Sequence, residues 1–344
     1  LDTYKYYIDF ASKFGIPYII MDEGWAKSTR DPYTPNPKVD LHELIRYGKE
    51  KNVGIVLWLT WLTVENNFDL FKTFNEWGVK GLKIDFMDRS DQWMVNSYER
   101  VAREAAKHHL FVDFHGSFKP AGLEYKYPNV LSYEGVRGME QMGGCYPDNS
   151  LYLPFMRNAV GPMDYTPGIF VTQVNKINPD NNSFVHSTLA RQLALYVTMY
   201  SPLQMAADLP EHYNQYLDAF QFIKDVAIDW DESKYLEAEP GDYITVARKA
   251  KGSSSWFVGN TSDENGHAST LKLDFLDAGK KYIATIYSDA KDAHYETNPQ
   301  AYTIRKGVVT SKSVLQLKAA PGGGYAISIV EATDNASVKG LKKL

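Results

Sequence analysis

The chain has 344 residues, a formal net charge of −5, 44% hydrophobic and 23% charged residues, and one cysteine. This length is sufficient for two domains, or for one large barrel with an appendage. The acidic balance disfavours a surface that follows nucleic-acid phosphates, Cys145 has no partner for an internal disulfide, and no apolar run reaches the roughly 18 to 20 residues that span a bilayer.

Helical and strand-like patterns alternate along the first part of the chain. The opening segment carries Tyr4, Ile8 and Ala11 at helical spacing, and Gly15 follows where a helix would stop. The same alternation then repeats three times. It predicts strands near residues 17–22, 53–59, 80–86 and 110–115.

Three more strands are expected near residues 130–134, 159–165 and 202–208, with helices over 183–200 and 212–227. Each strand is a nearly continuous apolar run, which is typical of a parallel sheet covered on both faces. We therefore predict a (β/α)8 TIM barrel whose first strand lies upstream of residue 1. A doubly wound open sheet is the competing architecture, but no glycine-rich phosphate loop follows the first strand to favour it.

The pattern changes near residue 232 to short strands separated by turn residues, which predicts an antiparallel β-sandwich. The expected domains are residues 1–231, a catalytic barrel incomplete at its N-terminus, and residues 232–344, an all-β domain. The chain starts without methionine and inside a helical pattern, so we expect a signal peptide or an upstream domain to have been removed.

Carboxylates recur where the predicted strands end, which is the edge of a parallel barrel that carries active sites. Their coincidence is more informative than any one of them, because scattered surface acids would not prefer the same end of successive strands. The strand-end groups are Asp22 and Glu23, Asp85 and Asp88, Asp113 and His115, and Glu134 with Glu140.

Asp85 is the strongest candidate for chemistry. It falls within an apolar run. Burying a carboxylate that has no functional role there would cost free energy, because the group loses its hydration. Lys83, two residues earlier, faces the same side of a regular strand and would keep Asp85 ionised, bind substrate, or form a structural salt bridge. Asp88 and Asp91 are instead expected to cap the helix that begins near Gln92.

His115 either positions a substrate hydroxyl or is a satisfied core histidine. No HExxH pattern and no second cysteine are present, so zinc is not expected. Glu134 and Glu140 offer oxygen ligands that suit a hard cation such as calcium, although Glu134 could instead pair with Arg137.

Paired carboxylates, aromatic walls and no organic cofactor fit glycoside hydrolysis, in which one carboxylate attacks and a carboxylic acid protonates the leaving oxygen. Trp25, Trp58 and Trp61 stand at or just past strand ends, where they either flank a sugar ring or pack at the rim.

Five ordered motifs resemble glycoside hydrolase family 97: "MDEGW", "KGLKIDFMDR", "DFHGSFKPAGL", "YPNVLSYEGVRGME" and "GPMDYTPG". The resemblance covers roughly residues 1–230 closely, and the β-rich tail lies where the family carries its C-terminal domain. It also implies an N-terminal β-sandwich before the barrel, and a periplasmic or secreted location.

The resemblance implies a role for particular residues. In the retaining branch of the family the nucleophile matches Asp85 and the acid/base matches Glu140. The family binds calcium beside the acid, which implies Glu134 as a ligand and Glu140 as a shared one. Inverting members carry a glutamate base directly after a histidine, whereas here His115 is followed by Gly116.

The resemblance therefore implies a retaining, exo-acting glycosidase. Because retaining members of the family look like α-galactosidases, it implies an α-galactosidase. Asp22 and Lys83 would read the C4 hydroxyl of the sugar, with His115 and Trp25 as further substrate contacts. An α-glucosidase with the same mechanism, and a carbohydrate-binding relative that has lost catalysis, are the alternatives.

Overall fold

The computed structural model describes residues 1–177, 183–334 and 337–344, and the chain forms two compact units. The first unit comprises residues 1–136 and 160–164, and the second comprises residues 137–159 and 165–344. The domain boundary placed by the sequence between residues 231 and 232 lies beside Trp230, where the first strand of the second unit's large sheet begins.

The first unit is built on a five-stranded parallel sheet with the order β1-β4-β5-β6-β7. Each strand matches one of the first five expected from apolar runs. The strands β4 to β7 are mostly buried, whereas β1 is partly exposed. Their bounds are β1 (Tyr18–Met21), β4 (Gly54–Thr60), β5 (Gly81–Asp85), β6 (Phe111–Phe114) and β7 (Val130–Tyr133).

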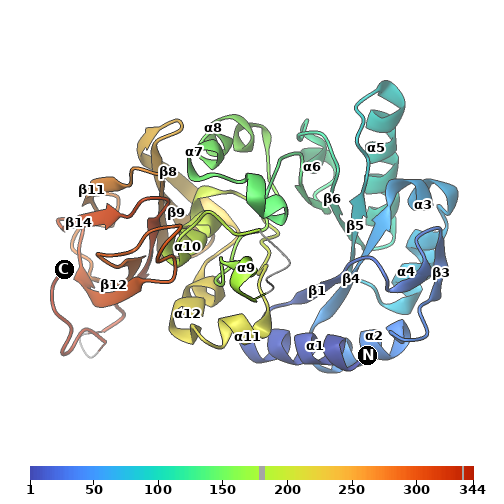
Figure 1. The fold of residues 1–344 in the computed structure, drawn as a ribbon, viewed down its shortest axis with the longest axis horizontal. Coiled ribbons are helices and arrows are strands. Elements are labelled where there is room, and N and C mark those ends of the chain that lie inside the picture. The colour runs from blue at the N-terminus through green and yellow to red at the C-terminus, as the bar shows by residue number, and fades with distance from the viewer. Residues whose placement is uncertain (178–182, 335–336) are drawn as a thin grey trace. The chain divides into compact units, whose positions relative to one another are not determined.

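The helices of this unit lie against the sheet (Figure 1). In α5 the buried residues Met94, Tyr98, Val101 and Ala105 recur every three or four positions, so they share one side of the helix. The helices are α1 (Asp2–Phe14), α2 (Leu41–Glu50), α3 (Trp61–Asn66), α4 (Leu70–Trp77), α5 (Gln92–Lys107) and α6 (Leu123–Lys126), and a hairpin joins β2 (Ala26–Ser28) to β3 (Asp31–Pro35).

Two expected strands are wrong. Residues 158–160 form a 3₁₀ turn, η2 (Asn158–Val160), and neither the rest of 159–165 nor 202–208 is strand. The segment 202–208 bonds to the loop near residues 167–170 instead of joining a strand ladder. Ala207 donates its N–H to the carbonyl of Pro167, and Phe170 donates its N–H to the carboxylate of Asp208. Among the described residues the parallel sheet therefore has five strands and does not close into a barrel.

The helical part of the second unit is more broken than the periodicity indicates. The helix expected over 183–200 is formed only as α10, and the one expected over 212–227 is interrupted near Tyr216. The elements are η1 (Met139–Gly144), α7 (Pro147–Ser150), α8 (Leu153–Met156), α9 (Val174–Ile177), α10 (Leu189–Thr198), α11 (Pro210–Tyr213) and α12 (Leu217–Asp225).

The all-β prediction for the C-terminal region is confirmed. Six antiparallel strands pair in the order β13-β12-β15-β10-β9-β8, and α10 packs against this sheet. A two-stranded sheet, β11 with β14, contributes to the same apolar core. The bounds are β8 (Trp230–Glu239), β9 (Tyr243–Ala250), β10 (Trp256–Ser262), β11 (His267–Lys272), β12 (Tyr282–Asp289), β13 (Tyr302–Val309), β14 (Val314–Ala319) and β15 (Gly324–Glu331).

Across the described ranges, the helices all lack the combination of length and apolar character that crossing a bilayer requires.

Candidate active site

Polar side chains gather at the carboxyl edge of the five-stranded sheet, as the sequence predicts. Because all five strands run parallel, their carboxyl ends share one edge. The groups that close the strands are Asp22 after β1, Thr60 in β4, Asp85 in β5, His115 after β6 and Glu134 after β7.

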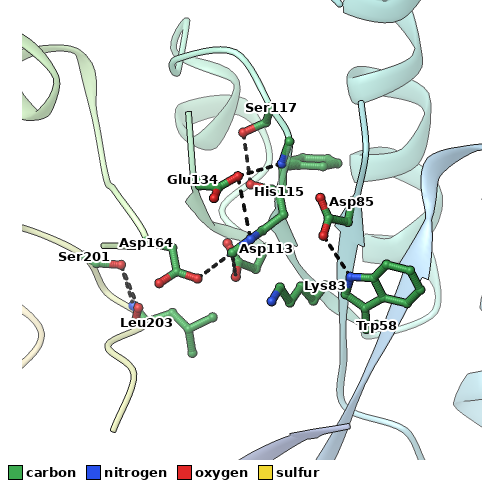
Figure 2. Close-up of polar contacts among 12 residues, drawn as sticks. Trp58, Lys83, Asp85, Asp113, His115, Ser117, Glu134, Asp164, Ser201 and Leu203 are labelled. Atoms are coloured by element: carbon green, nitrogen blue, oxygen red, sulfur yellow. Dashed lines mark hydrogen bonds and ion pairs between the residues drawn. The ribbon is translucent and has the colours of Figure 1, made fainter. Parts of the chain in front are cut away.

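Asp85 is the last residue of β5 and is half-buried. Its Oδ2 accepts a hydrogen bond of 2.9 Å from the indole N–H of Trp58 (Figure 2). Its Oδ1 accepts one of 2.6 Å from the backbone N–H of Phe86. Both carboxylate oxygens are therefore oriented by the protein before any ligand arrives. A reactive group held in this way loses little freedom when it reacts.

The backbone after Asp85 turns sharply and is tied to the loop after β6. Phe86 and Asp88 have left-handed φ values of 62° and 32°, and the N–H of Asp88 donates to the carbonyl of Gly116 at 2.5 Å. Gly116 has a φ of 51°, and a Cβ added there would lie 2.8 Å from the nitrogen of Phe86 and 3.1 Å from the Oδ1 of Asp85. The close approach of the two loops therefore requires glycine at position 116.

The two aspartates expected to cap α5 behave differently. Asp91 is the N-cap, and its Oδ1 accepts from the backbone N–H groups of Trp93 and Met94 at 3.1 and 3.4 Å. Asp88 lies three residues earlier in the turn that meets Gly116, so its expected capping role is wrong. Local spacing placed Asp88 near the helix, whereas the contact with the loop after β6 decided its backbone conformation.

Lys83 forms its ion pair with Asp22. The buried Lys83 Nζ lies 3.1 Å from the Oδ2 of Asp22, whose side chain is 57% exposed. The sequence left three roles open for Lys83: keeping Asp85 ionised, binding substrate, or forming a structural salt bridge. The contact with Asp22 is a salt bridge. The pair places a donor and an acceptor side by side at the strand ends, which is an arrangement that can bind a sugar hydroxyl from both directions.

His115 is held between two buried carboxylates of the first unit. Its Nε2 lies 2.6 Å from the Oδ2 of Asp164 and 3.3 Å from the Oδ2 of Asp113, and all three residues are almost fully buried. Burial alone would lower the pKa of His115, but the two carboxylates outweigh it and raise the pKa to about 11. Both carboxylates therefore favour the protonated form of the imidazole.

The pKa values of the two carboxylates, Asp113 and Asp164, shift in opposite directions. Burial, and then the charge of Asp164, raises the pKa of Asp113. Burial also opposes ionisation of Asp164, but the hydrogen bond with His115 outweighs it and lowers the pKa of Asp164. Asp164 is the nearer of the two carboxylate partners of His115. It stands in the motif "GPMDY", which the sequence analysis used for the family resemblance without giving Asp164 a place in the site.

Glu134 lies beside this cluster. Its Oε2 accepts a hydrogen bond of 2.8 Å from the backbone N–H of Gly116 and lies 3.8 Å from the Nδ1 of His115. The carboxylate is thus oriented by the same loop that contacts Asp85. It presents oxygen atoms of the kind that calcium prefers.

The donor atoms of Asp113, His115 and Asp164 lie within 4.8 Å of one another, a geometry consistent with a metal site. Calcium, however, prefers an all-oxygen shell, and here the imidazole nitrogen occupies the centre of the group through its 2.6 Å hydrogen bond. The three residues therefore fit a charge-compensated histidine better than a calcium shell. Glu134 provides the more suitable ligand for a hard cation.

The tryptophans near this edge have distinct positions. Trp25 is 2% exposed, and its indole N–H donates to the carbonyl of Trp58 at 2.7 Å. Trp25 therefore packs at the rim and does not present its ring to a sugar. Trp58 is also buried, but its own N–H reaches Asp85. Sequence spacing placed these residues at the correct edge without indicating which indole would contact Asp85.

Glu140 belongs to the second unit, where it is exposed on the 3₁₀ helix η1. Its predicted pairing with Asp85 stays a prediction from the family pattern.

Two family descriptions match the chain: "Glycoside hydrolase 97" over residues 1–136 and "Glycosyl-hydrolase 97 C-terminal, oligomerisation" over residues 229–330. A retaining alpha-galactosidase of Bacteroides thetaiotaomicron is 40% identical over 336 residues, which are 95% of this chain and 50% of that protein. A probable retaining alpha-galactosidase of Streptomyces bingchenggensis is 34% identical over 280 residues, 79% of this chain and 42% of that protein. The chain spans about half the length of the curated relatives it matches.

Solved structures agree with these matches. A family 97 enzyme from Pseudoalteromonas sp. strain K8, in complex with acarbose, superposes with a TM-score of 0.90 at 34% identity, covering 96% of this chain and 56% of that one. A beta-arabinopyranosidase superposes with a TM-score of 0.80 at 26% identity, covering 95% of this chain and 52% of that one. Together with the carboxylates at the sheet edge, these relatives define the class as the glycoside hydrolases. The chain belongs to glycoside hydrolase family 97, which confirms the resemblance carried by the five motifs.

Proposed function

We propose that the protein is a retaining, exo-acting α-galactosidase that removes terminal α-galactosides by double displacement. The carboxylate of Asp85 carries the proposal, because both of its oxygens are oriented at the carboxyl edge of the sheet. Gly116 supports the retaining assignment, since inverting relatives carry their base at this position. The names of two curated relatives, both retaining alpha-galactosidases or probable ones, support the substrate class.

In the first step, an oxygen of Asp85 attacks the anomeric carbon as the bond from that carbon to the glycosidic oxygen breaks. Glu140, as a carboxylic acid, gives its proton to the departing oxygen, and the sugar remains as an ester of Asp85. In the second step, Glu140 takes a proton from water, the water oxygen attacks the anomeric carbon, and the ester bond to Asp85 breaks. Two inversions give net retention, and such carboxyl pairs stand about 5 to 5.5 Å apart.

In this proposal the groups around Asp85 bind the hydroxyl groups of the sugar and hold the site in place. The ion pair of Lys83 and Asp22 offers a donor and an acceptor to the C4 hydroxyl, which distinguishes a galactoside from a glucoside. His115, held in place by Asp164 and Asp113, would position a sugar hydroxyl. In this proposal Trp25 acts indirectly, by supporting Trp58 through its hydrogen bond.

Calcium is part of the same proposal. Glu134 would hold the ion with a carboxylate oxygen, and Glu140 would share it, as the family pattern implies. A bound calcium ion would supply positive charge beside the acid/base. Glu134 fits this role because its carboxylate is already oriented by the N–H of Gly116.

Two further proposals rest on family membership. The five-stranded sheet would form part of a (β/α)8 barrel, as in the predicted architecture. The protein would work in the periplasm or outside the cell, which fractionation of the source cells would test.

The decisive experiment replaces the nucleophile in the full-length protein. Asp85→Gly should abolish hydrolysis of p-nitrophenyl α-galactoside, and external azide should partly restore it and give the β-galactosyl azide. Surviving activity, or an azide product of α configuration, would overturn the assignment. For the parent, NMR should show the α-anomer released first.

Substrate preference is tested by parallel hydrolysis of p-nitrophenyl α-galactoside and α-glucoside. Faster hydrolysis of the glucoside would replace the proposal with an α-glucosidase of the same mechanism. Binding of sugars without hydrolysis of either compound would indicate a carbohydrate-binding relative that has lost catalysis.

A further inference from the structure

Residues 165–172 form a loop of the second unit that has no regular secondary structure, yet most of its residues are buried. The backbone N–H and C=O groups of this buried loop join no strand ladder, so other groups must satisfy them. Side chains from outside the loop do so, and they hold the loop in one conformation.

Gln192 is the first of these side chains. It lies in α10 and is 0% exposed. Its Oε1 accepts hydrogen bonds from the backbone N–H groups of Gly168 and Ile169 at 3.0 and 3.2 Å. Its Nε2 has no hydrogen-bond partner in the parts of the chain that the structure describes. Gln192 therefore acts on the buried loop through its oxygen alone, and a substitution can either remove that oxygen or keep it.

Two more side chains bond the same stretch of the buried loop. The Oδ2 of Asp208 accepts from the backbone N–H groups of Phe170 and Val171 at 2.7 and 2.9 Å. The hydroxyl of Tyr213, the last residue of α11, donates to the carbonyl of Gly168 at 2.7 Å. Leaving a buried backbone group without its partner costs free energy. The conformation of the buried loop therefore depends on these side chains.

The buried loop in turn supports η1, the 3₁₀ helix that carries Glu140. The carbonyl of Tyr165, the first residue of the loop, accepts a hydrogen bond of 2.9 Å from the backbone N–H of Met139, which is 0% exposed. A Cβ added at Gly138 would lie 3.1 Å from the same carbonyl oxygen, so the two backbones pack closely. A short 3₁₀ segment has weak internal hydrogen bonds. Its position, and that of Glu140, is therefore set by this contact with Tyr165.

We propose that Gln192 is a positioning residue for the acid/base, with Asp208 and Tyr213 in supporting roles. By fixing the buried loop, these side chains fix the carbonyl of Tyr165 and so hold Glu140 in place. The inference rests on the proposed function, in which Glu140 gives a proton to the leaving oxygen. Proton transfer requires the donor within hydrogen-bond reach of that oxygen, so a relaxed loop weakens this step before it weakens the attack by the nucleophile.

The test separates proton donation from a general loss of structure by changing the leaving group. In the full-length protein, hydrolysis of α-D-galactosyl-(1→6)-D-glucose requires a proton on the departing sugar oxygen. Fluoride, by contrast, departs from α-D-galactosyl fluoride as a weak base that has little need of a proton. The kcat/KM of each substrate reports the step that breaks the bond to the leaving group. The ratio of the two values, disaccharide over fluoride, therefore measures how well Glu140 is placed.

Gln192→Met keeps the approximate volume of the side chain and removes the acceptor oxygen. It should lower the ratio by about tenfold, a part of the roughly hundredfold to ten-thousandfold that a general acid contributes. Gln192→Glu keeps an oxygen for both N–H groups and should return the ratio to near that of the parent. Tyr213→Phe removes only the hydroxyl and should also lower the ratio, which provides the test if Gln192→Met fails to fold.

Asn260→Leu is the matched control. Asn260 is likewise 0% exposed, and its Nδ2 donates to the carbonyl of Ile244 and to the hydroxyl oxygen of Thr245 within the C-terminal sheet. The substitution removes a buried amide without touching the buried loop. Its ratio should equal that of the parent, even where urea unfolding shows that the variant is less stable.

Glu140→Gln is the reference, because it removes the acid itself and should lower the ratio more than any other variant. If it does so while Gln192→Met and Tyr213→Phe leave the ratio unchanged, or slow both substrates in proportion, the positioning role is overturned and the proposed function stands. If Glu140→Gln leaves the ratio unchanged, or the parent hydrolyses neither galactoside, the proposed function is overturned, and the positioning role with it.

Discussion

A Cβ atom at Gly116 would lie 3.1 Å from the Oδ1 of Asp85, so the loop after β6 approaches the proposed nucleophile as closely as a residue without a side chain allows. The same glycine donates its N–H to Glu134 and accepts a hydrogen bond from Asp88. Gly116 thus links the carboxylate assigned to attack with the carboxylate assigned to calcium. Its effect is positional, because its backbone N–H orients Glu134 and its lack of a side chain leaves room for the Oδ1 of Asp85.

Gly116→Ala should lower kcat/KM for p-nitrophenyl α-galactoside by tenfold or more, since a small displacement of a reacting group can cost about a hundredfold. Gly15→Ala is the matched control. Gly15 also has a left-handed φ, 74°, at the end of α1, but an added Cβ there meets nothing within 4 Å. Parental kinetics in Gly116→Ala, with comparable stability of the two variants, would contradict the positional role.

Trp58→Phe should lower kcat more than it changes KM. The substitution keeps an aromatic ring against Phe86 but removes the N–H that donates to Asp85. Hydrogen bonds to charged groups contribute about 1.5 to 3 kcal/mol, which corresponds to roughly a ten- to hundredfold effect. Trp77→Phe, a half-buried tryptophan packed on Phe74 and His42, serves as the control. Equal losses in both variants would indicate lost packing instead.

Glu134→Gln should weaken calcium binding, measured by calorimetry of the metal-free protein, while the amide oxygen still accepts from the N–H of Gly116. Chelator should inactivate the parent, and added calcium should restore it. The substitution removes the negative charge that attracts the ion and leaves the shape of the side chain nearly unchanged. Undiminished calcium affinity would remove Glu134 from the ligand set.

Asp91→Ala should destabilise the protein by about 1 kcal/mol, the usual cost of losing an N-cap. Asp88→Asn is the matched comparison, because Asp88 makes no cap and asparagine tolerates its left-handed backbone. Urea unfolding of both variants measures the difference. A larger loss in Asp88→Asn than in Asp91→Ala would contradict the cap assignment.

Asp289 should make the stability of the second unit depend on pH. Burial raises the pKa of this carboxyl to about 6, although its Oδ2 accepts from the N–H groups of Ala320 and Gly324 at 2.8 Å each. Since the folded pKa exceeds the ordinary value of 3.8, the folded state binds the proton more tightly, and stability falls as the pH rises from about 4 to about 6.

Asp289→Asn removes this titration. Relative to the variant, the parent should lose about 2 to 3 kcal/mol between pH 4 and pH 7, which follows from a shift of about two pKa units. Urea unfolding of both proteins at pH 4, 5, 6 and 7 gives the comparison. A constant difference across that range would show that the carboxyl is not perturbed in the folded state.

The sequence alone determined the elements with strong local signals. The helical spacing that ends at Gly15, the buried strands such as β5, and the carboxylates that close them follow from periodicity and hydrophobicity, which act over a few residues. Asp91 as a cap and Asp85 at a strand end belong to this class. The five motifs gave the family, because their order along the chain is itself sequence information.

Only the tertiary structure decided how these groups are used. The hydrogen bond from Trp58 to Asp85 and the ion pair of Lys83 with Asp22 join strands separated by 27 and 61 positions, and no local pattern encodes such contacts. Asp164 shows the same limit. It lies in a segment expected to be strand, yet the segment is irregular and brings the Oδ2 of Asp164 to 2.6 Å from the Nε2 of His115. The sequence supplied the chemical groups and their place along the chain, while packing between distant segments set their partners, their charge and their orientation.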